Sequence, residues 1–551
     1  MMTRLAILAV SLLLLSGCSA AQTPTPARLP DTIETILDLA ERRYGGEAPG
    51  GAVLVMQGNE VLLAEGFGYA NLEWEQPASA QTAFRIGSIT KVFTATAILQ
   101  LVEDGTLELD APVSTYLPDL PGVLGRPTIG QLLNHTSGLG DHFSLPQIPA
   151  IMRNPITPDG IIDLMADTEL MFDPGTRWSY SNFGYVLLGR VITAVDPEHR
   201  AYADYIEDEI FAPLGMENSH YDRQSAIIPN RATGYDFGED GPVNTITFET
   251  SLADAAGALM TSADDMAIFT RALVNGSLLS PEMRDAAWTS TILPDGSDTE
   301  YGLGFNVTGF MGEPVIWHSG SINGFQATWI YQPETARTAA VFSNGYYRPN
   351  TTDTARRFLA ILDGQPAPEF AEQDFAEADW QSVQGRYELA DGSTLQIHVQ
   401  DGIRFNIDGG RWRELSYSGE NIFYSPDTLR HFIFDPEHDG TIVYVSTTLE
   451  RLTGTRIDGA IEGALVAMTL NADEARAISG QWDIGSGDLL TISFDGEQVF
   501  LQLPYQPPQR IFRSGVRTYF SRSAPISVEF AEEGETASIS LYGNAMALTR
   551  N

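Results

Sequence analysis

The sequence is almost without lysine and cysteine. Lysine occurs once in 551 residues, as Lys91, and cysteine once, as Cys18, so no disulfide can form within the chain. Arginine supplies the other cations, and Lys+Arg 32 against Asp+Glu 72 gives a formal net charge of −40. Such an acidic chain repels phosphate backbones, so no nucleic-acid partner is expected. An anionic membrane surface would repel it too, so attachment to a membrane requires an apolar or covalent anchor.

The N-terminus has the pattern of a secretory signal. A short basic start is followed by an apolar run from Leu5 to Leu15, which is shorter than the ~20 residues needed to span a bilayer. Leu15–Ser16–Gly17–Cys18 resembles the lipobox of bacterial lipoproteins, in which the cysteine is acylated. We therefore expect residues 1–18 to be a lipoprotein signal peptide and Cys18 to carry a lipid. The lipid would anchor the protein to a membrane of the cell envelope, in the outer membrane or periplasm. Cleavage of an ordinary signal peptide nearby is the alternative.

Composition divides the following residues into a tether and a mixed domain. Residues 19–30 are small, polar and proline-bearing, which is typical of a tether. In residues 31–365, a helix ending near Tyr44 and a hairpin are predicted first, helical periodicity dominates 88–290, and strand patterns return at 314–345. This order predicts an α/β (α+β) domain whose sheet joins segments that are distant in the chain.

The C-terminal part of the chain repeats itself. Gly385–Arg386–Tyr387 and the turns after it, Asp391–Gly392 and Asp401–Gly402, return as Gly480–Gln481–Trp482 with Ser486–Gly487 and Asp495–Gly496. The offset is 95 residues and shifts to 94 at the last turn. Short alternating runs between these turns are typical of β-strands. The repeat predicts two copies of one all-β module, at 375–460 and 470–551, as small antiparallel barrels. A single larger β-sandwich is the alternative.

Ser88 and Lys91 lie at the predicted start of a helix. Gly87 permits a sharp turn, and apolar residues recur at helical spacing from Val92 to Val102. Ser88 and Lys91 are three residues apart and share a helix face, where the N–H groups and positive dipole end favour an oxyanion. That field, with burial, lowers the pKa of a lysine and lets it act as a base, which arginine cannot do. A serine N-cap followed by a solvated lysine is the alternative, and it is weakened because this lysine is the only one.

A second motif, Tyr180–Ser181–Asn182, follows a predicted turn and leads into a predicted helix. In this position Tyr180 can share the proton of Ser88 with Lys91, and Asn182 can hold a substrate amide. A turn tyrosine followed by an Asx cap is the alternative, because Y-x-N also occurs elsewhere in the chain.

A third motif is His318–Ser319–Gly320, followed by Ser321. A strand is predicted up to Trp317, then a glycine-rich turn before the next strand. Gly320 would let a substrate approach the strand edge, and the N–H of Ser321 would complete an oxyanion hole with that of Ser88.

Each motif is weak alone, but in this order they resemble the serine β-lactamase and penicillin-binding-protein superfamily, in its class C-like branch. The resemblance covers roughly residues 31–363 and implies a β-lactamase-like domain, an antiparallel sheet with flanking helices. It implies that Ser88 is acylated and that Lys91 and Tyr180 accept and donate protons during the reaction. It also implies that the residues bordering the substrate are Asn182, His318, Ser319, Gly320 and Ser321. The two β-modules are similar to the layout of D-aminopeptidase-type members, in which they pack against the catalytic domain. Spacers or cell-wall-binding modules are the alternatives.

His318 departs from the family pattern, because many penicillin-recognising members have lysine there. A free imidazole titrates near pH ~6.5, so His318 should bind a substrate carboxylate more weakly than lysine would. This binding should also change between about pH 5.5 and about 8. This departure argues against efficient β-lactam hydrolysis and favours esterase or peptidase chemistry.

These observations predict a serine hydrolase that cleaves an amide or ester through a Ser88 acyl-enzyme, as an esterase, D-aminopeptidase or D,D-carboxypeptidase. The substrate would be a small molecule or peptide: a D-amino-acid peptide, an ester or a β-lactam. No metal or nucleotide cofactor is implied, because the eight histidines show no metal-ligand spacing. For His135, a structural hydrogen-bonding role is expected. A true β-lactamase is one alternative, and a non-catalytic binding lipoprotein of the cell envelope is another.

Overall fold

The computed structural model describes residues 29–550 except for short stretches. These are 239–240, 347–348, 366, 375–382, 400–401, 411, 427, 435–439, 460, 462–469, 484–488, 504–507, 522–525, 532–534 and 542–543. Cys18, the predicted signal peptide and nearly all of the predicted tether fall outside the described residues. Within the described part, no helix is long and apolar enough to cross a membrane.

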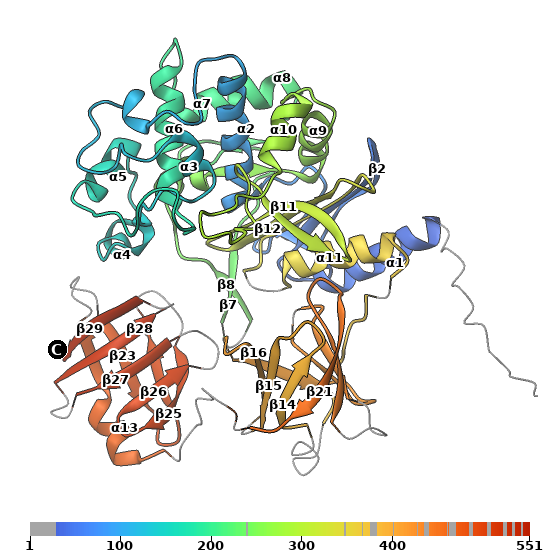
Figure 1. Ribbon diagram of the computed structural model, residues 1–551, viewed down its shortest axis with the longest axis vertical. Helices are drawn as coiled ribbons and strands as arrows, with labels where there is room; N and C mark the ends of the chain where they lie inside the picture. The colour runs from blue at the N-terminus through green and yellow to red at the C-terminus, as the bar shows by residue number, and fades with distance from the viewer. Residues whose placement is uncertain are drawn as a thin grey trace, which may run out of the picture.

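A six-stranded antiparallel sheet forms the centre of the first domain (Figure 1). Its order is β10 (Asn306–Phe310), β11 (Glu313–Ile322), β12 (Phe325–Gln332), β13 (Arg337–Ser343), β1 (Gly51–Gln57) and β2 (Glu60–Phe67). The predicted hairpin is β1–β2. Strand β1 also pairs with β13, with Gly51 opposite Ser343, so the sheet does join the two ends of the domain as predicted.

Both faces of this sheet are buried, and β1 shows how. Alternate side chains of a strand point to opposite faces. Val53 and Val55 pack with the helices α1 (Leu29–Tyr44) and α11 (Thr351–Leu362). Ala52, Leu54 and Met56 pack on the other face, in the larger core that includes α2 (Thr90–Glu103) and α9 (Ala263–Val274). The run of buried residues in β1 is therefore uninterrupted, as in a strand covered on both sides.

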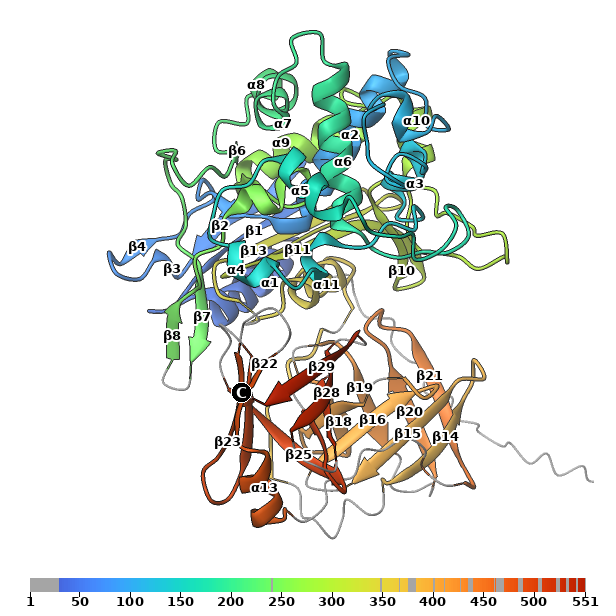
Figure 2. The same ribbon diagram turned by 90° about the vertical axis from the view of Figure 1, so that its left-hand side faces the viewer.

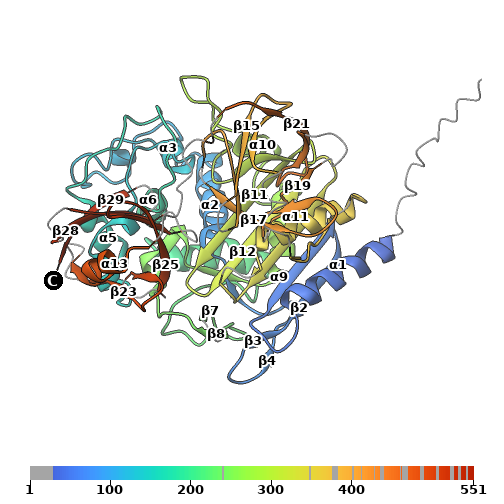
Figure 3. The same cartoon turned by 90° about the horizontal axis from the view of Figure 1, so that it is seen from below.

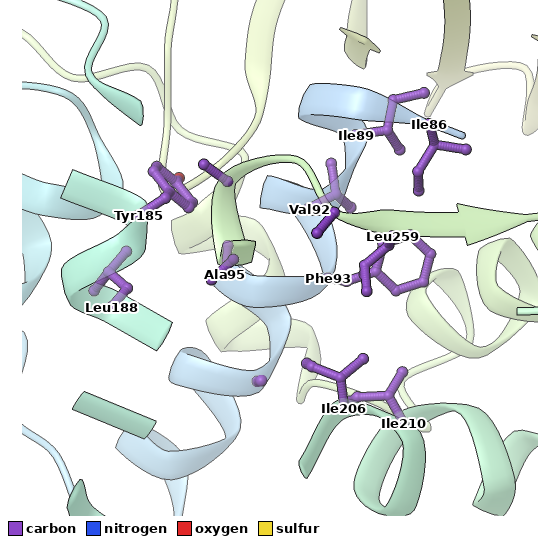
Figure 4. Packing of buried hydrophobic residues seen from close by; sticks show 14 of the residues in the cluster. Ile86, Ile89, Val92, Phe93, Ala95, Tyr185, Leu188, Ile206, Ile210 and Leu259 are labelled. Atoms are coloured by element: carbon purple, nitrogen blue, oxygen red, sulfur yellow. The ribbon is translucent and has the colours of Figure 1, made fainter. Parts of the chain in front are cut away.

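Helix α2 lies in the middle of the larger core. Its neighbours include α6 (Asn182–Val195), α7 (Tyr202–Ile206), the π-helical turn η4 (Glu207–Phe211) and β9 (Leu259–Thr261). Figure 4 shows side chains from these elements around it: Val92, Phe93 and Ala95 of α2, Tyr185 and Leu188 of α6, Ile206, Ile210 and Leu259. A helix held on several sides gives the residues at its start a fixed position.

Smaller elements surround this core. The other helices are α3 (Ile129–Leu133), α4 (Ile148–Ile151), α5 (Pro158–Met165), α8 (Ala212–Leu214) and α10 (Pro281–Ala287). The 3₁₀ turns are η1 (Gly87–Ile89), η2 (Val113–Thr115), η3 (His142–Ser144), η5 (Thr250–Leu252) and η6 (Asp254–Ala256). Short sheets pair β3 (Tyr69–Asn71) with β4 (Gln76–Pro77), β7 (Tyr235–Gly238) with β8 (Gly241–Asn244), and β9 with β5 (Phe84–Arg85) and β6 (His220–Tyr221).

The C-terminal part forms two separate closed barrels of eight antiparallel strands each. The first has β14 (Gly385–Leu389), β15 (Thr394–Val399), β16 (Ile403–Ile407), β17 (Arg413–Tyr417), β18 (Ile422–Tyr424), β19 (His431–Phe434), β20 (Thr441–Val445) and β21 (Arg451–Ile457). A helix, α13 (Ala472–Ile478), precedes the second, which has β22 (Gly480–Asp483), β23 (Leu489–Phe494), β24 (Val499–Gln502), β25 (Gln509–Gly515), β26 (Thr518–Ser521), β27 (Ile526–Phe530), β28 (Thr536–Leu541) and β29 (Asn544–Arg550). The prediction of two β-modules is confirmed, and the single sandwich is wrong.

The repeated motif marks the first strand of each barrel. Tyr387 of β14 and Trp482 of β22 occupy equivalent places, and both are fully buried. The hydroxyl of Tyr387 donates to the carbonyl of Val383, and the indole N–H of Trp482 donates to that of Ile478. In each barrel, the large aromatic residue of the first strand thus holds the segment that precedes this strand through a hydrogen bond.

The first barrel is attached to the α1–α11 side of the domain. Leu429 joins the hydrophobic cluster of these helices, the N–H of Met311 donates to the carbonyl of Thr448, and the guanidinium of Arg357 donates to that of Thr428. Both barrels lie below the first domain in Figures 1 and 2, and Figure 3 shows them from below. The first barrel therefore packs against the side of the domain that carries α1 and α11, opposite to α2.

Candidate active site

Ser88 lies in a tight turn that leads directly into α2. The turn is η1, and the helix begins two residues after Ser88. Gly87 has a φ of +49°, a left-handed conformation that favours glycine. Ile86 and Ile89 on either side are fully buried (Figure 4), which anchors the turn. The predicted turn and helix are both found, with Ser88 in the 3₁₀ turn before the helix.

Lys91 is fully buried beneath Ser88. Its Nζ lies 3.2 Å from Ser88 Oγ, 2.7 Å from Asn182 Oδ1 and 2.8 Å from the carbonyl oxygen of Ala256. The structure thus brings together three residues that the sequence singled out, and it adds Ala256 of η6.

Burial lowers the pKa of Lys91 from 10.5 to about 7, because the charged ammonium loses its hydration. The carboxylate of Asp141 acts in the opposite direction and raises it. The two groups are linked through Asn182, whose Nδ2 donates to Asp141 Oδ2 at 2.7 Å. At neutral pH, a large fraction of Lys91 is therefore the free amine, the form that can accept a proton.

The partners of Lys91 direct its lone pair. A neutral amine has two N–H donors and one lone pair, and the carbonyl of Ala256 can only accept. Asn182 also presents its oxygen, since its nitrogen is engaged by Asp141. Two acceptors take the two N–H groups, so the lone pair is left for the hydroxyl of Ser88, 3.2 Å away. This geometry suits transfer of the Ser88 proton to Lys91.

Tyr180 closes the site on a second side. It precedes α6, whose N-cap is Ser181, with Ser181 Oγ accepting from the N–H of Gly184. The Lys91 Nζ lies 4.8 Å from the centre of the Tyr180 ring. Burial raises the pKa of Tyr180 above its usual value, while a hydrogen bond with Ser88 lowers it. The phenol thus stays protonated at neutral pH and can donate a proton or a hydrogen bond.

The third motif lies within a strand, which corrects the sequence-based prediction of a turn. Strand β11 continues through His318, Ser319, Gly320 and Ser321 to Ile322, and only two residues separate it from β12. Strand β10 begins at Asn306, opposite Trp317, so the part of β11 after Trp317 has no strand partner on that side and packs against η1 instead. The glycine is required by this close approach and not by a turn.

Gly320 and Gly87 are the points of closest approach. A Cβ on Gly320 would overlap the carbonyl oxygen of Ile86 and lie 2.9 Å from the nitrogen of Ser88. A Cβ on Gly87 would lie 2.8 Å from the nitrogen of Ser321. The two glycines bring the backbone amide of Ser321 to the turn that carries Ser88, as an oxyanion hole between the two would require.

His318 is buried, with 3% of its surface exposed, and it is neutral. Its Nδ1 lies 2.7 Å from the carbonyl oxygen of Ser319, so Nδ1 carries the proton, and Nε2 accepts from the hydroxyl of Tyr301 at 3.1 Å. Burial and the nearby charge of Lys91 lower the pKa of His318 to about 3. The expectation that His318 titrates between about pH 5.5 and about 8 is therefore wrong, because that expectation used the pKa of a solvated imidazole.

Sequence reasoning missed several residues that complete the site. Asp141, Ala256 and Tyr301 come from loops far apart in the chain, and no local spacing marks them. His135 was singled out, and the expected hydrogen-bonding role is found: its Nδ1 accepts from the N–H of Ser181 at 3.2 Å. Among the described residues, no group of His, Cys, Asp and Glu side chains could hold a metal ion.

Comparison with known proteins places this site in a family. The family model Beta-lactamase matches residues 37–363, more than half of the chain. The D-aminopeptidase of Brucella ovis is 28% identical over 509 residues, covering 86% of this chain and 91% of its own length. Penicillin-binding protein 4* of Bacillus subtilis is 28% identical over 404 residues, covering 68% of this chain and 87% of its own.

Solved structures agree with these sequence matches. The D-amino acid amidase from Ochrobactrum anthropi SV3 complexed with D-phenylalanine gives a TM-score of 0.52 at 27% identity, covering 61% of this chain and 99% of that one. The octameric penicillin-binding protein homologue from Pyrococcus abyssi gives a TM-score of 0.55 at 26% identity, covering 78% and 100%. The chain therefore belongs to the β-lactamase family and is a serine hydrolase, as its sequence predicted.

Proposed function

We propose that the protein hydrolyses amides of D-amino acids, including short peptides with a D-residue at the N-terminus, through an acyl-enzyme on Ser88. The observation that carries this proposal is the arrangement around Lys91. Two oxygen acceptors occupy its N–H groups and Ser88 Oγ lies 3.2 Å away, while burial lowers its pKa to about 7. Such a lysine is a general base for a serine nucleophile at neutral pH.

The reaction begins when Ser88 Oγ attacks the substrate carbonyl and its proton passes to Lys91. The N–H groups of Ser88 and Ser321 stabilise the developing oxyanion. The protonated Lys91, with the phenol of Tyr180, then returns the proton to the leaving amine, and the C–N bond breaks. Water attacks the ester that remains on Ser88, releases the acid and restores the serine.

Recognition would come from the residues that border Ser88. The Nδ2 of Asn182 has a second N–H besides the one that Asp141 accepts, and this N–H is available to a substrate carbonyl. The strand segment Ser319–Gly320–Ser321 offers backbone groups beside the nucleophile. His318 is neutral and gives no charge to a substrate carboxylate, which favours substrates whose carboxyl group is an amide or ester.

The preference for D-residues is supported by the relatives, whose names are D-aminopeptidase and D-amino acid amidase. The net charge of −40 also attracts substrates that carry a protonated amine. Both considerations favour an aminopeptidase or amidase over a carboxypeptidase, whose substrates present a free carboxylate.

A hydrolysis panel tests the proposal. D-alaninamide and D-phenylalaninamide are compared with their L-enantiomers, with a peptide ending in a free D-Ala-D-Ala carboxylate, and with nitrocefin. We expect release of ammonia from the D-amides, little from the L-amides, and no release by Ser88→Ala. Lys91→Arg keeps the positive charge but cannot deprotonate, so it should also be inactive. Equal rates for D- and L-amides would contradict the stereochemistry, and turnover by Ser88→Ala would contradict the nucleophile.

For the location of the protein, we propose that Cys18 is acylated and holds it in the cell envelope, in the outer membrane. The support is the sequence alone: the apolar run from Leu5 to Leu15 and the lipobox-like residues before Cys18. Metabolic labelling with an alkyne fatty acid should mark the wild-type protein and should not mark Cys18→Ser. A wild-type chain that takes up no label and is found free in the medium would contradict the anchor and favour ordinary secretion.

A further inference from the structure

His135 holds the backbone on both sides of Tyr180. Its carbonyl oxygen accepts from the N–H of Ser179 at 2.9 Å, and its ring Nδ1 accepts from the N–H of Ser181 at 3.2 Å. The His135 and Tyr180 rings also contact each other, with centres 4.3 Å apart and planes inclined by 40°. One residue thus contacts the Tyr180 ring and binds the backbone N–H groups of Ser179 and Ser181, the residues on either side of Tyr180.

The His135 ring is fixed in one neutral tautomer. Because Nδ1 accepts a hydrogen bond, the proton is on Nε2. Nε2 is buried without a hydrogen-bond partner among the described residues, and the rings of Tyr180, Tyr185 and Tyr301 lie around the imidazole at 4.3, 5.3 and 4.8 Å between centres. Burial, together with the charge of Lys91, lowers the pKa of His135 well below its usual value. The imidazole therefore stays neutral and carries no proton in the reaction.

The local backbone explains why histidine suits this position. His135 has a φ of +60°, a left-handed conformation in which Asn, Asp and His are more common than other non-glycine residues. Asparagine would adopt it and supply an acceptor near Nδ1, but it has no ring to place under Tyr180. Phenylalanine would supply a ring but no acceptor. Histidine combines the tolerated backbone, the acceptor and the ring.

We infer that His135 is the positioning residue for Tyr180: it fixes the phenol beside Ser88 and Lys91 and takes no part in proton transfer itself. The inference rests on the proposed function of the site. It follows from the ring contact with Tyr180, from the hydrogen bonds to Ser179 and Ser181 on either side of it, and from the place of the Tyr180 ring, 4.8 Å from Lys91 Nζ. Replacing the His135 side chain removes the ring contact and the Nδ1 acceptor for the N–H of Ser181, while the backbone carbonyl that accepts from Ser179 remains.

Two variants separate the contributions of the acceptor and the ring. His135→Asn keeps an acceptor and the left-handed backbone, and His135→Phe keeps a ring. Each is made in the wild-type chain and in Tyr180→Phe, and the rate of Ser88 acylation by a D-amino-acid p-nitrophenyl ester is measured. Misplacement of a group by about 1 Å lowers rates by up to about 100-fold, so we expect losses of this order in the wild-type background. In Tyr180→Phe the same changes should cause little further loss, because the group they position is already gone.

Two further measurements distinguish positioning from loss of folding. His431→Asn in the first barrel removes another buried histidine, whose Nδ1 contacts the carbonyl of Leu429. This control should alter the melting temperature without changing the acylation rate. In the His135 variants the acidic limb of the pH–rate profile should stay near pH 7, because Lys91 is still the base.

The possible outcomes are distinct. Wild-type acylation with equal losses in both backgrounds, or no loss in either His135 variant, would overturn the positioning role and leave the proposed function standing. A displaced acidic limb in the His135 variants would mean that the imidazole titrates with the reaction, which would also overturn it. A wild-type chain that is never acylated on Ser88 would overturn the proposed function, and the role of His135 with it.

Discussion

Removing the charge of Asp141 is expected to move the pH profile of Ser88 acylation toward acid pH. Asp141 raises the pKa of Lys91, in opposition to the larger effect of burial. In Asp141→Asn, Lys91 is still buried but the carboxylate that raises its pKa is gone, so the pKa of Lys91 falls below 7. The base must be unprotonated to accept the Ser88 proton. A lower pKa frees it at lower pH, and the acidic limb shifts down.

The size of the shift follows from the hydrogen-bonded link between the two charges. Lys91 Nζ and Asp141 Oδ2 each lie 2.7 Å from opposite ends of the Asn182 amide. This places the charges roughly 8 Å apart, an interaction of about 2 kcal/mol at an effective dielectric constant of about 20. The Asp141 side chain is 20% exposed, so solvent screening reduces this energy. About 1 kcal/mol remains, which corresponds to a shift of roughly 0.7 pH unit.

The assay is the acylation rate with a D-amino-acid p-nitrophenyl ester from about pH 5 to about pH 9, a range that brackets the base. The matched control is Asp38→Asn, which removes the same charge from an exposed position on α1, across the sheet from α2. We expect the midpoint near pH 7 in wild type and in the control, and a lower midpoint in Asp141→Asn. The plateau at high pH should fall, because a lysine with a lower pKa is a weaker base. An unchanged or higher midpoint in Asp141→Asn would refute the electrostatic reasoning.

Three further changes test other parts of the structure. Gly320→Ala should lower the acylation rate by up to about 100-fold, because the added Cβ would overlap the carbonyl oxygen of Ile86 beside Ser88. The control Gly309→Ala in β10, where the added Cβ meets open space, should react at the wild-type rate. Equal acylation rates in the two variants would disprove the close approach. His318→Gln should leave the pH dependence of inhibition by a carboxylate-bearing boronate unchanged, since the imidazole is neutral above about pH 3; a lost pH dependence would show that His318 does titrate. Burial raises the pKa of Asp254 from 3.8 to about 6, so stability is lost as pH rises through this interval. Asp254→Asn should therefore raise the free energy of unfolding near pH 8 by up to about 3 kcal/mol and change it little near pH 4, as measured by urea titration; equal effects at both pH values would contradict the raised pKa.

Much of the fold can be predicted from the sequence, because its signals are local. The periodicity after Ser88 predicts α2, the apolar runs after residue 50 predict the β1–β2 hairpin, and the 95-residue repeat predicts two barrels, which begin at Gly385 and Gly480. The pairing of Ser88 with Lys91 can also be predicted from the sequence, because the two residues are one helical turn apart. In each case the structural neighbours are also neighbours in the chain.

The rest of the site depends on contacts between distant segments. Asp141 acts on Lys91 from a loop 50 residues away, and Ala256 from one 165 residues away. No pattern in either segment indicates such a contact. Gly320 was placed in a glycine-rich turn where it would let a substrate approach, but it lies within a continuous strand and allows η1 to pack against that strand. The charge state of His318 could not be predicted either, since it follows from burial in the folded chain.

The most direct test of the account is the mass of the intact protein during reaction with a D-phenylalanine p-nitrophenyl ester. Rapid acid quenching followed by peptide mapping should find the D-phenylalanyl group on Ser88. The adduct should be absent from Ser88→Ala and from Lys91→Arg. No adduct in the wild-type chain, or an adduct that persists in Ser88→Ala, would contradict the claim that Ser88, activated by Lys91, is the nucleophile.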